Sequence, residues 1–130
     1  MARGVQSLRR MNDMTSALHD MIDCIVHLEQ TLVEPAQRSL LHCTFLDVQH
    51  HVCMAGVFVD AGGEVALFAC REAYLAALSL GKLVEPGTQA WQAVDKLLVA
   101  IEQHIPIEDR DLRRFLDEPY RSLSDDVPRA

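Results

Sequence analysis

Histidine and aspartate are the residues of this chain best suited to binding a metal. Six histidines occur among 130 residues. His19, Asp23 and His27 follow one another at intervals of four, and Asp47 and His51 repeat that spacing further along. Ligands four residues apart share one face of a helix, which is how helical bundles present metal ligands. These five residues are therefore the ligand set of one hypothesis, a metal- or small-ligand-binding bundle.

The polarity of the surrounding residues argues against that hypothesis. His19, Asp23 and His27 fall on the polar side of the helix they would occupy, whereas the ligands of a bundle site must project inward. Asp47 and His51 border an apolar stripe, where a hydrogen-bonded pair is the simpler interpretation. Neither HExxH nor a pair of ExxH motifs occurs. We therefore expect no bound metal and no cofactor. The five His and Asp residues would act as ligands only if the alternative, a metal- or small-ligand-binding bundle, holds.

The cysteines lack the spacing of a reactive or metal-binding pair. Cys24, Cys43, Cys53 and Cys70 form no CxxC motif. Cys43 and His50 would stand two helical turns apart, about 10 Å along the axis, which is too far for a thiol–imidazole pair on one helix. Four unpaired thiols among apolar neighbours are typical of buried cysteines in a reducing compartment. We expect inert core cysteines and a cytoplasmic protein.

No motif of a common enzyme class is present. The sequence contains no P-loop, no GxGxxG and no GxSxG. Catalysis would require a composite site assembled from distant residues, and we expect the protein not to be an enzyme. Its 19 acidic and 12 basic residues give a formal charge of −7, which repels phosphate backbones and anionic membranes. We expect no nucleic-acid partner.

Export and membrane insertion are also disfavoured. Arg9 and Arg10 are followed by a segment with Asp13 and Asp20 rather than by the apolar run of a signal peptide. The apolar stretch from Val52 to Leu80 has the length of a membrane span. It is interrupted by Asp60, Glu64, Arg71 and Glu72, which are costly in a bilayer. We expect no membrane association.

Hydrophobic periodicity predicts five helices. Apolar residues recur at intervals of three and four over residues 5–34, 35–59, 64–80, 88–105 and 107–116. Pro35, Gly62 with Gly63, Gly81 and Pro106 separate these segments, and Thr88 is placed to cap the fourth. The short connections favour antiparallel neighbours. The predicted fold is all-α, a four- to five-helix up-and-down bundle.

Residues 56–69 allow a second interpretation. Val57–Val59 and Val65–Phe68 would be the strands of a β-hairpin whose turn contains Gly62 and Gly63. Short apolar runs do not distinguish strand from helix by periodicity alone, so an α+β fold stays open as the alternative. In either case residues 1–118 are predicted to form a single domain. Residues 119–130, rich in Pro, Ser and Asp, are predicted to form a mobile tail.

Two single residues carry further expectations. Glu29 falls on the apolar side of the first helix and would need a buried partner, for which Arg71 is the candidate. Trp91 begins the apolar stripe of the fourth helix and is expected in the core.

Apolar surface in excess of what a small domain hides predicts an interface. The segments 35–59 and 64–80 both lack a wide polar face, so the Val52–Leu80 region is a candidate for homodimer formation. The side chains expected to be buried by self-association are Leu40, Leu46, Val57, Leu67, Leu75 and Leu78. The alternative is that the first and fourth helices cover both segments.

The C-terminal region offers a second candidate contact. Phe115, Leu116 and Tyr120 lie beside Arg113 and Arg114, a combination of aromatic residues and arginine that is enriched at binding hot spots. Alternatively, Phe115 and Leu116 pack on the core of the domain itself. Together these features favour non-catalytic protein–protein binding, of an adaptor, toxin-neutralising or secretion-chaperone type.

Overall fold

The computed structural model describes the backbone of residues 2–117 and the side chains of residues 13–114 and 116. Five α-helices follow in order: α1 (Ala2–Thr31), α2 (Pro35–Phe58), α3 (Gly63–Gly81), α4 (Gln89–Glu102) and α5 (Arg114–Asp117). Two 3-10 helices, η1 (Val59–Ala61) and η2 (Ile107–Arg113), connect them. Within residues 2–117 there is no strand, so the predicted all-α bundle is confirmed. The predicted tail at 119–130 lies outside the described residues.

The breaks between helices follow from proline and glycine. Pro35 occupies the first position of α2, where its missing N–H is not needed. Gly62 and Gly63 have φ angles of 69° and 70°, a left-handed conformation that glycine adopts without steric cost. At Thr88 the hydroxyl oxygen accepts a hydrogen bond from the Trp91 N–H at 3.2 Å, which caps α4 as expected.

The β-hairpin alternative at residues 56–69 is wrong. Val57 and Phe58 complete α2, residues 59–61 form η1, and Val65 already lies in α3. Helical packing decides between the two forms, because Val52 and Ala55 continue the buried stripe of α2. Residues 66, 69, 70 and 73 begin the buried stripe of α3 in the same way. The paired glycines therefore separate two helices rather than turn a hairpin.

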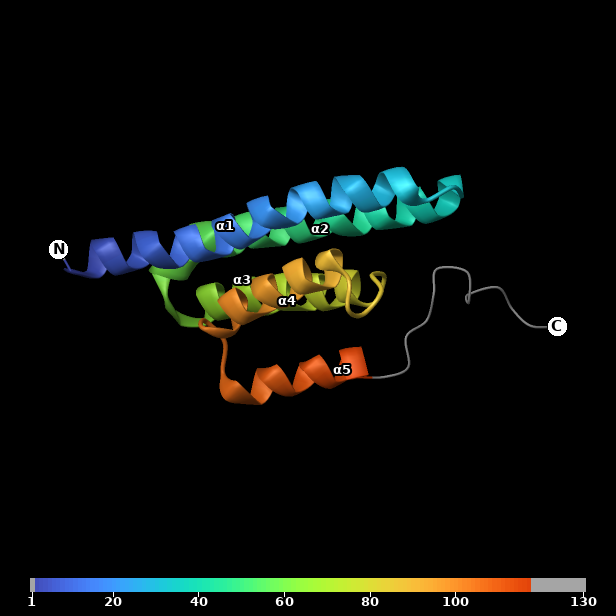
Figure 1. Ribbon diagram of the computed structural model, residues 1–130. Coiled ribbons are helices and arrows are strands. Elements are labelled where there is room, and N and C mark those ends of the chain that lie inside the picture. Colours follow the sequence, from blue (N-terminus) through green and yellow to red (C-terminus); the bar gives the residue numbers. More distant parts are fainter. Residues whose placement is uncertain (1, 118–130) are drawn as a thin grey trace.

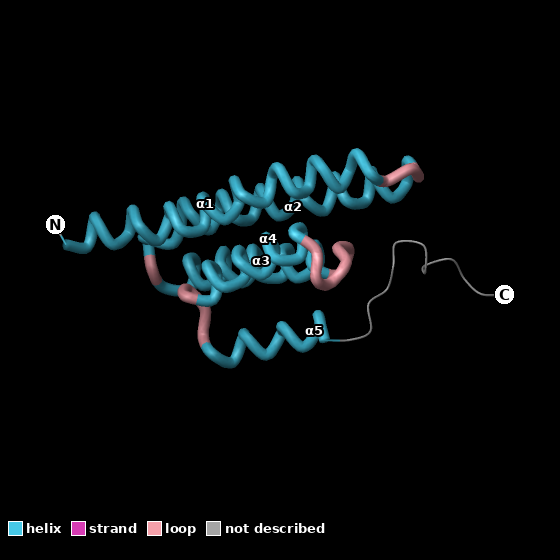
Figure 2. Tube along the Cα trace, in the orientation of Figure 1, coloured by secondary structure: helices cyan, strands magenta, loops and turns pink. Residues whose placement is uncertain are grey.

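The four long helices form two antiparallel layers (Figures 1 and 2). One layer is α1 with α2 and the other is α3 with α4, and α2 packs along α3 while α1 packs along α4. The η2 and α5 segment returns along the outer side of the α3–α4 layer (Figure 1). The largest fully buried side chains are Tyr74, Met14, Met21, Ile25, Leu41, Leu80, Leu97, Leu98 and Ile101. Trp91 is only partly buried and packs at the edge of this core.

No helix within residues 2–117 combines the length and the hydrophobicity needed to cross a bilayer.

Candidate functional site

The histidines and aspartates of the metal hypothesis are spread over the surface. His19, Asp23 and His27 are exposed on α1, and Asp47 is exposed on α2. His51 is half-buried, with its Nε2 atom 3.4 Å from Asp47 Oδ1, which is the local pair that the sequence suggests. Among the residues that the structure describes, no group of three or more His, Cys, Asp or Glu side chains is placed to hold a metal ion.

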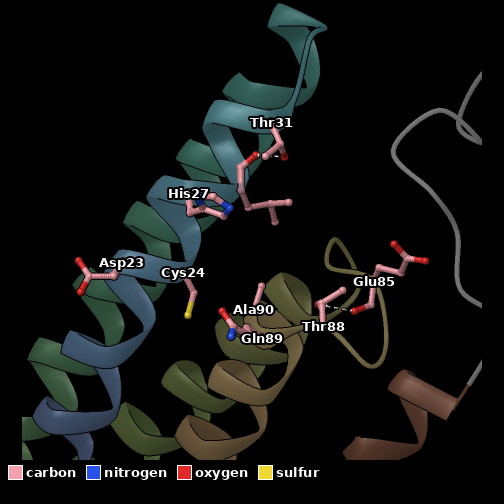
Figure 3. A pocket seen from close by; sticks show the side chains of 9 residues that line it. Asp23, Cys24, His27, Thr31, Glu85, Thr88, Gln89 and Ala90 are labelled. Atoms are coloured by element: carbon pink, nitrogen blue, oxygen red, sulfur yellow. Dashed lines mark hydrogen bonds between the residues drawn. The ribbon is translucent and has the colours of Figure 1, made fainter.

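Asp23 and His27 do line a hollow of about 400 Å³ between α1 and the start of α4. Figure 3 shows that the groups around it do not converge, because the carboxylates of Asp23 and Glu85 are directed to opposite sides. Cys24 points towards Gln89 and Ala90 (Figure 3). The hollow thus brings polar side chains to one region without forming a set of reacting groups.

The four cysteines differ in their exposure to solvent. Cys70 is buried in the core, and burial raises the pKa of its thiol. Cys24 is half-buried, whereas Cys43 and Cys53 are exposed on α2. The expectation of four core cysteines is therefore wrong for Cys43 and Cys53. Both cysteines were expected in the core because their sequence neighbours are apolar. The exposed side of α2 is also poor in charged residues, so apolar neighbours do not indicate burial there.

Glu29 pairs with a different residue from the one expected. Its Oε1 atom lies 3.0 Å from His42 Nδ1 on α2, while the Arg71 Nε donates to Asp109 Oδ2 at 2.6 Å. The expected Glu29–Arg71 pair is wrong because α1 has α2 and α4 as its neighbours and α3 has α2 and α4. Glu29 and Arg71 thus lie on helices that face each other diagonally across the bundle.

A partly buried polar network fastens η2 to α3 and α4. The fully buried Tyr74 donates its hydroxyl to Glu102 Oε2 at 2.7 Å. Arg113 donates from Nε to the same oxygen and from Nη1 to Asp95 Oδ1 at 2.7 Å. Arg110 adds a hydrogen bond to the Glu102 carbonyl oxygen at 2.9 Å.

The contacts of this network shift the pKa values of Tyr74 and Arg113 upwards. Burial and the carboxylate of Glu102 raise the pKa of Tyr74, so the phenol stays neutral. Burial alone would lower the pKa of Arg113, but hydrogen bonds to Glu102 and Asp95 outweigh it and raise the pKa above its ordinary value. A permanently charged guanidinium with two carboxylate partners is an anchor rather than a proton donor.

Two of the C-terminal residues expected at a partner interface are engaged inside the domain. Arg113 belongs to the partly buried network, and Leu116 packs against the core beside Gly81. A Cβ at Gly81 would approach Leu116 Cδ2 to 3.0 Å, so glycine is what permits this contact. Arg114 is exposed, while the side chain of Phe115 and all of Tyr120 lie outside the described residues. That these residues contact a partner stays a prediction.

The most prominent exposed feature is an apolar surface along α2 and α3, which we call the α2–α3 face. Its centre is a groove lined by Met54 on α2 and by Val65 and Phe68 on α3. We also assign to it the exposed Leu46 and Val57 of α2 and the exposed Leu75 of α3. Phe68 is 65% exposed and Val57 is 66% exposed. Exposed valines or leucines are ordinary singly, but a group that includes a largely exposed phenylalanine is typical of a binding surface.

The residues expected in self-association are only partly on this surface. Leu46, Val57 and Leu75 are assigned to the α2–α3 face, and Leu40 is also exposed on α2. Leu67 is half-buried, and Leu78 is 3% exposed. Leu78 was therefore wrongly expected to be available, because it turns into the core with the small residues of α3.

A groove of about 270 Å³ runs between the two helices on this face. The α2 side carries His50 and His51, whose rings meet edge to face with centroids 5.2 Å apart. The α3 side carries Phe68 and Glu72. Glu72 is half-buried and has no hydrogen bond or ion pair to any other described residue. The groove is therefore apolar, with imidazoles on one side and an unpaired carboxylate on the other.

Sequence reasoning named the two helices of this face but did not single out Phe68 or Glu72 as exposed on it. One signal was available: between residues 39 and 59, Asp47 is the only Asp, Glu, Lys or Arg. A helix of that length with one such residue has few charged side chains on its solvent-facing side. Comparisons with protein-family models, curated proteins and solved structures find no match for this chain.

Proposed function

We propose that this chain is a non-catalytic protein-binding module, of an adaptor, toxin-neutralising or secretion-chaperone type, that binds through the α2–α3 face. The observation that carries the proposal is the exposure of Phe68 and Val65, each more than half accessible, around one groove. Removing apolar surface from water is the main favourable contribution to association. A partner that covers these side chains would gain that contribution.

The remaining polar groups support a binding role over a chemical one. Arg113, Glu102 and Tyr74 are committed to one structural network. Glu29 is paired with His42 at the opposite side of α2 from the groove. Free thiols at Cys43 and Cys53 on the surface suit a reducing compartment, which supports a cytoplasmic location as part of this proposal.

Co-purification from the natural host with matched valine variants tests the proposal. Val57→Asp places a charge on the α2–α3 face, whereas Val99→Asp makes the same change at an exposed site of α4. Exposed substitutions usually alter stability by under about 0.5 kcal/mol, so both variants should fold. A protein retained by the wild type and by Val99→Asp, but lost with Val57→Asp, is the expected result. Equal retention by all three chains would contradict the proposal.

Small-ligand binding is the second candidate, supported by the hollow beside Asp23 and His27. Native mass spectrometry of untagged protein tests it. A stoichiometric small molecule that is lost in Asp23→Asn and His27→Gln would favour this candidate. Protein that carries no bound small molecule would contradict this second candidate.

A further inference from the structure

We infer that the partner seated on the α2–α3 face is a second copy of this chain, related by a twofold axis that runs along the seam between α2 and α3. The inference rests on the proposed function, because it names the partner of the same surface. With this axis, α2 of each protomer lies over α3 of the other. The same residues then contact each other twice, as in any isologous interface.

The size of the exposed surface fits a dimer. The six side chains of the face are between 38% and 66% exposed, and at roughly 150 to 200 Å² for a large apolar side chain they present on the order of 500 Å². A standard interface contributes about 800 Å² from each partner, of which a little over half is apolar. The α2–α3 face with its flanking polar residues therefore supplies about one side of a standard interface.

Charge complementarity within the groove favours a self-association over an unrelated partner. His50 and His51 lie at the same level of the seam as Glu72, because all three line one groove. An axis along the seam preserves this level, so Glu72 of each protomer faces the partner's His50 and the partner's His51. His51 already has Asp47 beside it, while His50 has only its ring contact with His51.

Pairing across the interface would satisfy the one carboxylate of the groove that lacks a hydrogen-bond partner among the described residues. Burying a carboxylate without a donor is costly, and an imidazole N–H supplies that donor. The reciprocal arrangement provides one donor for each Glu72 and one acceptor for each His50. A single chain thus carries both halves of the complementary pair.

The net charge of the chain does not oppose this arrangement strongly. The formal charge of −7 repels a second copy in general, but the outer side of α2 contributes only Asp47 over residues 39–59. The other acidic residues of this region are Asp60 in η1 and Glu64 and Glu72 in α3. Added salt should screen the general repulsion and leave the apolar contact, so association should tighten rather than weaken with salt.

The neighbouring α3–α4 seam shows that the chain covers apolar surface with its own segments elsewhere. The η2 and α5 segment lies along the outer side of α3 and α4, where Leu116 packs beside Gly81 and Val94. No segment within residues 2–117 covers the α2–α3 seam in this way. A second copy would do so with the same two helices from each side.

Sedimentation velocity of the full chain at 2 to 200 µM tests the inference. The wild type and Val99→Asp should sediment with twice the chain mass of 14.6 kDa, while Val57→Asp should raise the dimer dissociation constant at least tenfold. Glu72→Lys should weaken the dimer as well, because it places a cation against the partner's imidazoles. Combining it with His50→Asp places a carboxylate opposite the new lysine and should restore the dimer to within about threefold of the wild type.

Each contrary result has a distinct meaning. A wild type that stays at 14.6 kDa at 200 µM overturns the dimer. If the co-purification experiment still shows a protein lost with Val57→Asp alone, the proposed function stands and only the identity of the partner was wrong. If retention is equal in all variants, both fall. A dimer that Val57→Asp leaves intact, or that the added His50→Asp change fails to restore, contradicts the twofold arrangement along the seam.

Discussion

Replacing Arg113 by Met should destabilise the fold by about 2 to 3 kcal/mol, because it removes the anchor of η2 while keeping most of the aliphatic volume. The lost contact with Glu102 contributes most of this free energy, since the Glu102 carboxylate is only 12% exposed. A hydrogen bond to a charged group contributes about 1.5 to 3 kcal/mol. The Asp95 end, with a 39% exposed carboxylate, adds about 0.2 to 1 kcal/mol, as surface ion pairs do. Water entering beside Glu102 offsets part of the sum.

Urea unfolding at pH 7, followed by circular dichroism, measures this change. For a chain of this length each kcal/mol lowers the melting temperature by about 3 to 5 °C, so the melting temperature should fall by about 6 to 15 °C. Arg114→Met is the matched control, because Arg114 is the next residue, is exposed, and has no ion pair within the described part of the chain. It should change stability by under about 0.5 kcal/mol.

The comparison of the two arginines decides whether the network holds η2 in place. Equal shifts for Arg113→Met and Arg114→Met would refute the reasoning, because they would show that Glu102 does not depend on its guanidinium partner. A proteolysis assay adds a local readout. Arg113→Met should speed cleavage within residues 107–117, and unchanged cleavage would contradict a role of Arg113 in fastening that segment.

Three further predictions follow from single contacts. Because the raised pKa of Tyr74 favours the neutral phenol in the folded state, its stabilisation is present below about pH 10, the ordinary tyrosine pKa, and is lost as the pH rises above it. The free energy of unfolding of Tyr74→Phe should therefore fall less steeply between pH 9 and 11 than that of the wild type, and identical slopes would count against it. Thr88→Ala should cost about 1 kcal/mol through loss of the α4 cap, whereas Thr31→Ala, at the end of α1, should cost clearly less in the same urea titration; equal costs would argue against the cap. Pulsed alkylation with mass spectrometry should label the exposed Cys53 at least tenfold faster than the buried Cys70, whose pKa is raised, and comparable rates would show that the core opens readily.

The helices and their breaks could be predicted because each depends on local chemistry. Pro35 fits only the first turn of a helix, the positive φ angles at Gly62 and Gly63 suit glycine, and the Thr88 hydroxyl reaches an N–H three residues away. The hairpin at 56–69 failed as an alternative for a non-local reason. Its short apolar runs are compatible with the residue spacing of a strand and with that of a helix. The packing of α2 against α3 selects the helix.

The side-chain partners could not be predicted because they depend on which helices are neighbours. Glu29 has its partner on α2 and Arg71 has its partner on η2, and neither follows from spacing along the chain. Periodicity identifies an apolar stripe but not which of two stripes faces the core. Leu78 and Phe68 were therefore hard to tell apart in sequence, although one is buried and the other exposed.

The central claim is that the α2–α3 face is covered by a partner when the protein works. Hydroxyl-radical footprinting of Met54 and Phe68 tests it most directly, since both side chains are exposed in the isolated chain and both react readily. The measurement compares dilute purified protein with the native assembly recovered from the host. The expected result is protection of Met54 and Phe68 in the assembly, with the exposed Val99 on α4 reacting equally in both samples. Equal oxidation of Met54 and Phe68 in the two samples would contradict the claim.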